Sequence, residues 1–264
     1  MTRNTRILMQ CIYWAFVLYL LVPLALMMLM GFKDSKFIGF PIRSWTLDWY
    51  LGVFGDAVVV QAFVYSMFIA VASTALALFM GVWIAVALAG RSFWGRAIIL
   101  GLTLLPAVIP GVISAIAFRI AARVVGMEPG MWAIIWSHAI HNVPFVVLVV
   151  MARLTTLPKS YGEAAQDLGA DPIITFFRIT LPYLTPAMIG GGVFCMLLSF
   201  DDFVRSFFLG GYEPTLPVLI FAKLRSGMSP EINAISTIVL VLTALLGLWA
   251  ERSMRGMSKR AAND

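Results

Sequence analysis

Charge is scarce in this sequence. Only 12% of its 264 residues are charged, 61% are hydrophobic, and the mean hydropathy is +0.93. Ordinary soluble domains have about 25% charged residues, so the composition excludes that class. We predict an all-α protein that folds within a membrane.

Several functional motifs are missing as well. The sequence has no G-x-x-x-x-G-K-[ST] run, so it lacks a P-loop for ATP phosphates. The motifs G-x-S-x-G and H-E-x-x-H are also absent, which removes two routes to an intramembrane hydrolase. No basic helix stands clear of the apolar runs, and this argues against nucleic-acid binding.

Cysteine and histidine are rare. Cys11 and Cys195 both lie in apolar runs, which is typical of small core residues rather than of a disulfide or metal pair. His138 and His141 are spaced i, i+3 and could bind a metal, but no third ligand is nearby. We interpret them as a polar layer packed between helices, and no metal is predicted.

Six apolar runs are long enough to cross a bilayer, which takes about 20 residues. They are Ile7–Met30, Gln61–Ala89, Ala97–Phe118, Met131–Met151, Pro186–Leu209 and Ile232–Ala250. The first run is about twice as long as the apolar part of a signal peptide, and no small-x-small cleavage site follows it, so we expect it to remain as an anchor.

These runs predict three regions. Residues 1–60 form an N-terminal transmembrane helix and a periplasmic loop, residues 61–252 form a transmembrane core with helices at about 61–89, 97–118, 131–151, 186–209 and 232–250, and residues 253–264 form a cytoplasmic tail. With six spans both termini lie on one side, and basic residues favour the cytoplasm for that side. The segments on the cytoplasmic side contain Arg3, Arg6, Arg91, Arg96, Arg153, Lys159, Arg178, Arg252, Arg255, Lys259 and Arg260. The segments on the outer side contain fewer basic residues, namely Lys33, Lys36, Arg43, Arg119, Arg123, Arg205, Lys223 and Arg225.

One cytoplasmic loop, residues 160–182, carries helix-capping signals. Ser160 and Glu163 have the spacing of a capping box, and Gly169 stands where a helix ends with a left-handed residue. Asp171 can cap a second helix that begins with Pro172 and ends at Leu181-Pro182. The pattern predicts a helix-turn-helix beside the membrane, which either enters a partner's groove or packs only on its own spans.

The same loop resembles a family motif. Glu163-Ala164-Ala165, Gly169 and Ile179-Thr180-Leu181-Pro182 match EAA-x3-G-x9-I-x-L-P, the EAA loop of type I ATP-binding-cassette (ABC) importer permeases. The resemblance implies the type I permease fold, with the loop as a coupling helix that docks into the ATPase. It implies coupling roles for Glu163, Ala164, Ala165, Asp167, Gly169, Ile179, Leu181 and Pro182. No cofactor is expected in this chain, since the partner ATPase would bind ATP and magnesium.

Three further strings resemble the smaller membrane subunit of spermidine/putrescine permeases: residues 45–50, 198–203 and 229–234. This resemblance implies a polyamine importer in the bacterial inner membrane, with no catalysis by this chain itself. The implied partners are a dimer of ABC ATPases, a paralogous second permease subunit and a periplasmic solute-binding protein.

Polar residues inside the spans are candidates for the substrate path, because ionisable groups in hydrocarbon cost several kcal/mol unless they face a cavity or a partner. Asp201 and Arg205 are spaced i, i+4, which favours a local ion pair. Asp202 has no such partner, so we expect it to be the better carboxylate for a cationic amine. Ser199 and Trp49, from the matched strings, complete the candidate path.

Some features leave alternatives open. Several polyamine permeases have an acid after the proline that corresponds to Pro110, whereas Gly111 stands here, and Arg119 and Arg123 follow. An aminoalkylphosphonate or a zwitterionic, amino-acid-like solute is therefore an alternative substrate, and a self-sufficient secondary carrier is an alternative class. Candidate hinges are Pro106, Pro110, Gly111, Pro144 and Gly190-Gly191-Gly192.

Overall fold

The computed structural model describes residues 3–35, 39, 41–89, 93–227 and 229–260, with the side chains of residues 4–252 within those ranges. These residues form helices, together with an isolated antiparallel bridge between Lys33 and Trp45. Lys36 and Arg91, which entered the charge count, and the end of the tail after residue 260 lie outside the described residues. So do the side chains of the remaining tail.

The chain divides into two compact units. One consists of residues 1–61 and 219–242, and the other of residues 62–218 and 243–264. We call them the first and the second unit and describe each by itself.

The first unit contains α1 (Arg3–Met30), α2 (Asp48–Gly55), most of α11 (Leu216–Ser226) and the first part of α12 (Pro230–Arg260). The turn after α1 is held by α2: Trp49 Nε1 donates to the carbonyl of Lys33 at 2.9 Å, and the ring of Tyr50 packs 4.6 Å from that of Phe32. Gly31 permits this packing, because a Cβ there would lie 2.6 Å from Tyr50 Oη.

The second unit is built around α3 (Ala57–Leu88), α6 (Met131–Leu154) and α9 (Leu181–Phe200). Its main core joins all three helices and consists of Ala77, Val82, Ala85, Val143, Val146, Val147, Val150, Leu184 and Cys195. A glycine brings α3 close to α6, since a Cβ on Gly81 would lie 2.6 Å from Val146 Cγ1. Small residues at helix contacts are typical of membrane bundles, where close packing replaces the hydrophobic effect.

Among the residues that the structure describes, five helices are long and apolar enough to cross a membrane: Asn4–Met30, Ala57–Leu88, Met131–Leu154, Pro172–Phe200 and Pro230–Arg252. The expected third span is broken into α4 (Arg96–Val108) and α5 (Gly111–Val124), which meet at 110°. The prediction of one continuous helix over 97–118 was therefore wrong. The cause is Pro110: it holds Ile109 in an extended conformation, with ψ of 131°, and the chain restarts in a new direction. Pro106 lies inside α4 without ending it.

The helix that contains the fifth predicted span, 186–209, differs from the prediction at both ends. It begins as α8 (Pro172–Thr175), passes through a π-helical turn, η1 (Phe176–Thr180), and continues as α9. Leu181-Pro182 therefore does not end the second loop helix, contrary to the prediction. A π turn widens the hydrogen-bonding ring, and directly before Pro182 it accommodates a residue that cannot donate to the helix.

The same span ends at Phe200 instead of Leu209. The chain turns at Asp201, and a separate short helix, α10 (Phe203–Leu209), follows. Asp202 starts this helix, because its Oδ1 accepts a hydrogen bond from the backbone N–H of Arg205 at 2.9 Å. The α10 helix packs against α5 and α6.

Candidate functional site

The loop between α6 and α9 forms two helices, as the sequence predicts. The first, α7 (Lys159–Asp167), ends at Gly169, which has φ of +81°. Ala170 N–H donates to Ala165 O at 2.9 Å and Gly169 N–H donates to Gln166 O at 2.8 Å, which is the Schellman pattern. The left-handed end at Gly169 is thus confirmed.

The two predicted caps have different outcomes. Asp171 Oδ1 accepts from Ile173 N–H at 2.6 Å, and Pro172 is the first residue of α8, so the second cap is confirmed. The capping box is wrong, because α7 begins at Lys159 with Pro158 as its cap and no side-chain cap bond forms. Ser160 lies inside the first turn and not before it.

The surface of the loop is open. In α7, Glu163, Ala164 and Asp167 are exposed, and Ala165 is buried. Large apolar side chains stand beside the acids: Tyr161 is 53% exposed, Leu168 89% and Ile173 66%. We call Tyr161, Glu163, Ala164, Asp167, Leu168, Gly169 and Ile173 the loop surface. Exposed apolar side chains gathered on one short segment are typical of a surface that binds another protein.

The motif residues Ile179 and Leu181 are half-buried, while Pro182 is exposed. They lie where the loop joins α9, and a set of contacts fixes this junction to α6. The Arg153 guanidinium lies 4.0 Å from the ring centre of Tyr183 and donates to the Tyr183 carbonyl at 3.3 Å. Tyr183 Oη in turn donates to the carbonyl of Thr156 at 3.0 Å. We call Arg153, Thr156 and Tyr183 the junction clamp.

A layer of buried polar residues crosses the second unit near the other end of α9. His138 Nδ1 and Ser199 Oγ are 2.7 Å apart, Ser199 Oγ and Ser73 Oγ are 2.9 Å apart, and Asn142 donates to the carbonyl of Cys195 at 3.1 Å. The interpretation of the histidines as interhelical packing is confirmed for His138. Within the described residues no three His, Cys, Asp or Glu side chains are grouped to hold a metal ion.

Arg205 pairs with Asp202, so the expected pair of Asp201 with Arg205 was wrong. Its Nη1 lies 2.5 Å from Asp202 Oδ2, while its Nη2 is 3.2 Å from Ser114 Oγ and 2.9 Å from His141 Nδ1. The i, i+4 rule fails because α9 has already ended at Asp201. Asp201 is exposed, and its carboxylate forms no ion pair within the described part of the chain.

Ser199, His138 and Asp202 follow one another in the order of a catalytic triad. However, His138 Nε2 and Asp202 Oδ2 are 3.9 Å apart, and Asp202 is already paired with Arg205. Ser199 is only 5% exposed and His138 only 1%. A buried hydroxyl without access for a substrate cannot act as a nucleophile, so this group is packing and not an active site.

Trp49, the remaining candidate, belongs to the first unit. It lines a cavity of about 420 Å³ together with Asp34, Thr46, Asp48, Gly52, Asp56 and Glu231. The carboxylates of Asp56 and Glu231 both accept from Lys223 Nζ, at 3.2 and 2.6 Å. Burial alone would lower the pKa of Lys223, but these two carboxylates raise it above its ordinary value. Burial would likewise raise the pKa of Asp56, and its bonds to Lys223 and to backbone N–H groups lower it instead.

Comparison with known proteins agrees with this architecture. Residues 77–263 match the family described as the binding-protein-dependent transport system inner membrane component. The spermidine/putrescine transport system permease protein PotC of Escherichia coli strain K12 is 32% identical over 248 residues, which are 93% of each chain. The putrescine transport system permease protein PotI of the same strain is 32% identical over 93% of this chain and 90% of its own.

Solved structures share the fold. A bacterial ABC transporter that imports the acidic polysaccharide alginate superposes with a TM-score of 0.74 over 96% of this chain and 98% of its own, at 16% identity. The methionine ABC transporter MetNI, in an inward-facing conformation, gives 0.64 over 75% and 95% of the two chains, at 17% identity. The all-helical fold with broken and bent spans is that of ABC importer permeases, and this chain belongs to the family of binding-protein-dependent transport system inner membrane components.

Proposed function

We propose that this chain is the permease subunit of an ATP-driven importer for polyamines of the putrescine and spermidine type. The supporting observation is the exposed loop surface on α7 and the start of α8, which is joined through one continuous helix, Pro172–Phe200, to the polar layer of the second unit. The substrate class is supported by the 32% identity to PotC and PotI, which extends over 93% of this chain.

The loop surface is the docking site for an ABC ATPase subunit, which binds ATP and magnesium. Glu163 and Asp167 offer charge to the partner, and Ala164 keeps the helix thin so that the two backbones approach closely. Gly169 sets the angle between α7 and α8, while Ile179, Leu181 and Pro182 pass the motion into α9. The loop and both termini lie in the cytoplasm.

The remaining partners complete the importer. A periplasmic solute-binding protein delivers the substrate to the face opposite the loop, and a second, paralogous permease subunit encloses the path. Residues 61–252 form the transmembrane core, preceded by an anchor helix with its periplasmic loop and followed by a cytoplasmic tail.

Asp201, and not Asp202 as expected from the sequence, is the better carboxylate for the substrate path, because Asp202 has Arg205 as its partner. Ser199 lies two residues before Asp201, in the polar layer, and belongs to the same candidate path. Trp49 receives cations beside the acids of the first unit. Aromatic faces and carboxylates are the groups that bind alkylammonium ions.

Uptake of labelled putrescine tests this proposal. It is measured in cells that lack the gene and in the same cells after the gene has been restored. The wild type is expected to restore uptake, Glu163→Lys to abolish it, and Glu213→Lys, a matched charge reversal of an exposed acid between α10 and α11, to retain it. ATPase subunits that co-purify with the wild type and with Glu213→Lys, but not with Glu163→Lys, would support docking at the loop surface. Restored uptake of 2-aminoethylphosphonate in place of putrescine would refute the substrate class.

A further inference from the structure

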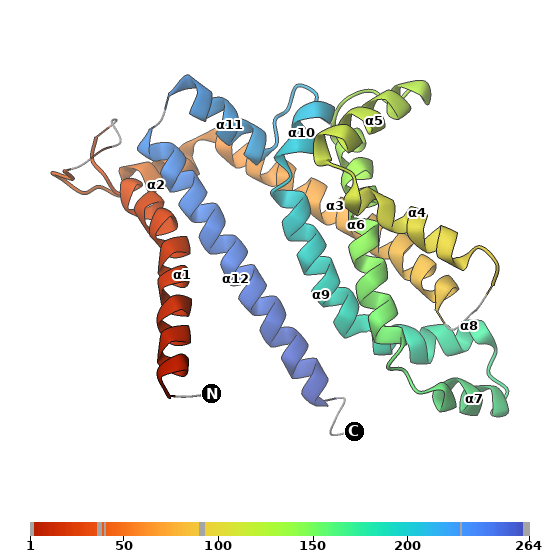
Figure 1. Cartoon of the computed structure of the whole chain (residues 1–264). Coiled ribbons are helices and arrows are strands. Elements are labelled where there is room, and N and C mark those ends of the chain that lie inside the picture. The colour runs from red at the N-terminus through yellow and green to blue at the C-terminus, as the bar shows by residue number, and fades with distance from the viewer. Residues whose placement is uncertain (1–2, 36–38, 40, 90–92, 228, 261–264) are drawn as a thin grey trace. The chain divides into compact units, whose positions relative to one another are not determined.

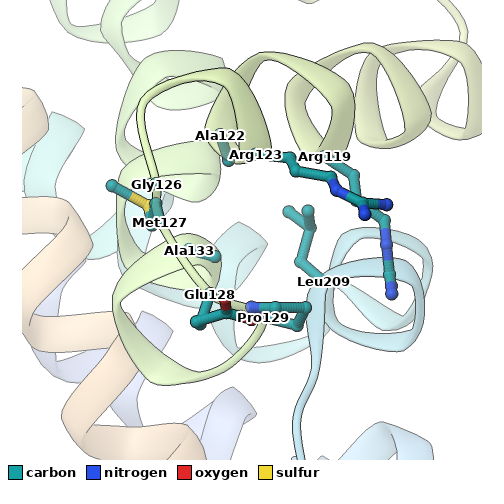
Figure 2. A pocket seen from close by; sticks show the side chains of 9 residues that line it. All are labelled: Arg119, Ala122, Arg123, Gly126, Met127, Glu128, Pro129, Ala133 and Leu209. Atoms are coloured by element: carbon teal, nitrogen blue, oxygen red, sulfur yellow. The ribbon is translucent and has the colours of Figure 1, made fainter.

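A basic pocket lies at one end of the second unit, and none of its lining residues belongs to the polar layer. It encloses about 260 Å³ between α5, the loop that follows it, the start of α6 and the end of α10. Figure 2 shows the side chains of Arg119 and Arg123 together at one rim, with Glu128, Pro129 and Leu209 across from them. Ala122 and Ala133 leave the interior empty because their side chains are short.

The backbone fixes the shape of this pocket. Gly126 has φ of +75° and ends α5, with Met127 N–H donating to Ala122 O at 2.8 Å. Gly130 N–H donates to Leu209 O at 2.8 Å, which joins the start of α6 to the end of α10. Backbone hydrogen bonds therefore hold the walls of the pocket, one at the end of α5 and one between the start of α6 and the end of α10.

Within the described residues, neither Arg119 nor Arg123 has an anionic partner. Arg119 donates from Nη1 to the carbonyl of Phe208, which uses one of the five N–H groups of its guanidinium. Arg123 forms no hydrogen bond or ion pair within the described part of the chain, and Glu128 pairs with neither arginine. Two guanidinium groups side by side repel each other unless an anion lies between them, and their fork of donors fits phosphate oxygens.

The helix that carries the arginines is amphipathic. Ile113, Ile116, Ile120 and Val124 form one stripe at helical spacing, and they are 59%, 42%, 63% and 83% exposed. Ala115 and Ala122 face the protein on the opposite side. At about 100° per residue, Arg119 and Arg123 fall between these two faces. This is the arrangement of a helix that lies in a membrane surface, with its apolar side in the acyl region and its cations at the headgroups.

The depth of the pocket agrees with that placement. The α6 helix has 24 residues and is therefore about 36 Å long, slightly more than the hydrocarbon thickness of about 30 Å. The pocket lies at its first turn, and the coupling loop follows its last turn, so the two lie at opposite ends of this helix (Figure 1). Both the first turn of α6 and the pocket are thus at the level of lipid headgroups.

We infer that the Arg119–Arg123 pocket binds the phosphate of an anionic phospholipid. The apolar stripe of α5 contacts the acyl chains of the same lipid layer. The inference does not depend on the transported substrate. Only the leaflet depends on the proposed function, because a cytoplasmic coupling loop places the pocket in the periplasmic leaflet.

Native mass spectrometry of the full-length protein, titrated with phosphatidylglycerol and with phosphatidylcholine, tests the inference. Arg119→Gln with Arg123→Gln is expected to weaken the tightest phosphatidylglycerol binding roughly tenfold or more, since charge-assisted bonds are lost. The matched control, Arg43→Gln with Arg225→Gln, removes two exposed arginines of the first unit and should leave that binding unchanged. Equal binding by both double variants and the wild type would overturn the inference.

A gain-of-binding variant guards against misfolding as the cause. Glu128→Gln removes the acid of the pocket and should tighten phosphatidylglycerol binding several-fold, which a damaged protein could not do. Unchanged or weaker binding by Glu128→Gln would count against the pocket. Inorganic phosphate and 2-aminoethylphosphonate, each added at millimolar concentration, separate the sources of the anion. Competition by either would overturn the lipid assignment in favour of a soluble anion.

Discussion

Neutralising Asp202 should destabilise the protein through Arg205, and the substitution Asp202→Asn isolates this effect. Asparagine caps a helix about as well as aspartate, so the bond to the Arg205 backbone at the start of α10 is retained. The carboxylate that lies 2.5 Å from the guanidinium is lost, and Arg205 is only 5% exposed. Leaving one partner of a buried ion pair uncompensated costs about 3–5 kcal/mol.

Ser114 and His141 offset part of that cost, because they keep polar contacts with Arg205 Nη2 at 3.2 and 2.9 Å. We therefore expect the free energy of unfolding to fall by about 3 kcal/mol. The assay is reversible unfolding of the purified protein in mixed micelles, followed by tryptophan fluorescence. Arg205→Met should cost a similar amount, and the double variant should cost less than the two single changes together. A loss below about 0.5 kcal/mol for Asp202→Asn, or strict additivity in the double variant, would refute the assignment of Asp202 to Arg205.

Three other outcomes follow from the same geometry. Asp201→Asn removes an exposed carboxylate that has no ion-pair partner within the described residues. The substitution should therefore lower putrescine uptake several-fold and change the free energy of unfolding by less than about 0.5 kcal/mol; normal uptake would exclude Asp201 from the path. Gly169→Ala places a side chain at φ of +81° and should lower the free energy of unfolding by about 1–2 kcal/mol. The membrane spans should stay intact, but less ATPase should co-purify with this variant. Undiminished co-purification would show that binding of the ATPase does not depend on the angle between α7 and α8. The contacts of Lys223 should make the first unit sensitive to pH. The pKa of Asp56 is lowered, so the stability that this group contributes is present above pH 3.8 and is lost as the pH falls through the pKa of the folded state. The pKa of Lys223 is raised, so the stability that this group contributes is present below pH 10.5 and is lost as the pH rises through the pKa of the folded state. Lys223→Met should reduce both dependences in amide exchange of α2 and the start of α12, and an unchanged pH profile would contradict the role of the ion pairs.

The sequence predicts local structure best where one residue type fulfils one backbone requirement. Gly169 ends a helix because of its φ, and Asp171 with Pro172 starts the next, and both were predictable without knowledge of the packing. Four of the apolar runs also predict spans to within a few residues, since the bilayer sets their length.

Predictions failed where an apolar run conceals a break in the helix. The run from Ala97 to Phe118 is predicted as one span, but Pro110 divides it, and α5, bent by 110° from α4, packs against α10 and α6. The pairing of Asp202 with Arg205 could not be read from i, i+4 spacing, because that rule assumes an unbroken helix. Aspartate is among the residues preferred at the start of a helix, and this was the available signal for a helix start at Asp202.

The helix from Pro172 to Phe200 has a mechanical consequence. It is about 43 Å long and it is held to α6 by the junction clamp at Tyr183. Tyr183 therefore divides the helix into a short arm of about 16 Å toward α7 and α8 and a long arm of about 26 Å toward Ser199 and Asp201. If the rod tilts about this point, a displacement of 1 Å at α8 becomes roughly 1.6 Å at Asp201, in the opposite direction. A small inward displacement of the helix at one membrane surface would then produce a larger outward displacement near the other surface. The position of Tyr183 in the helix determines the ratio of the two displacements.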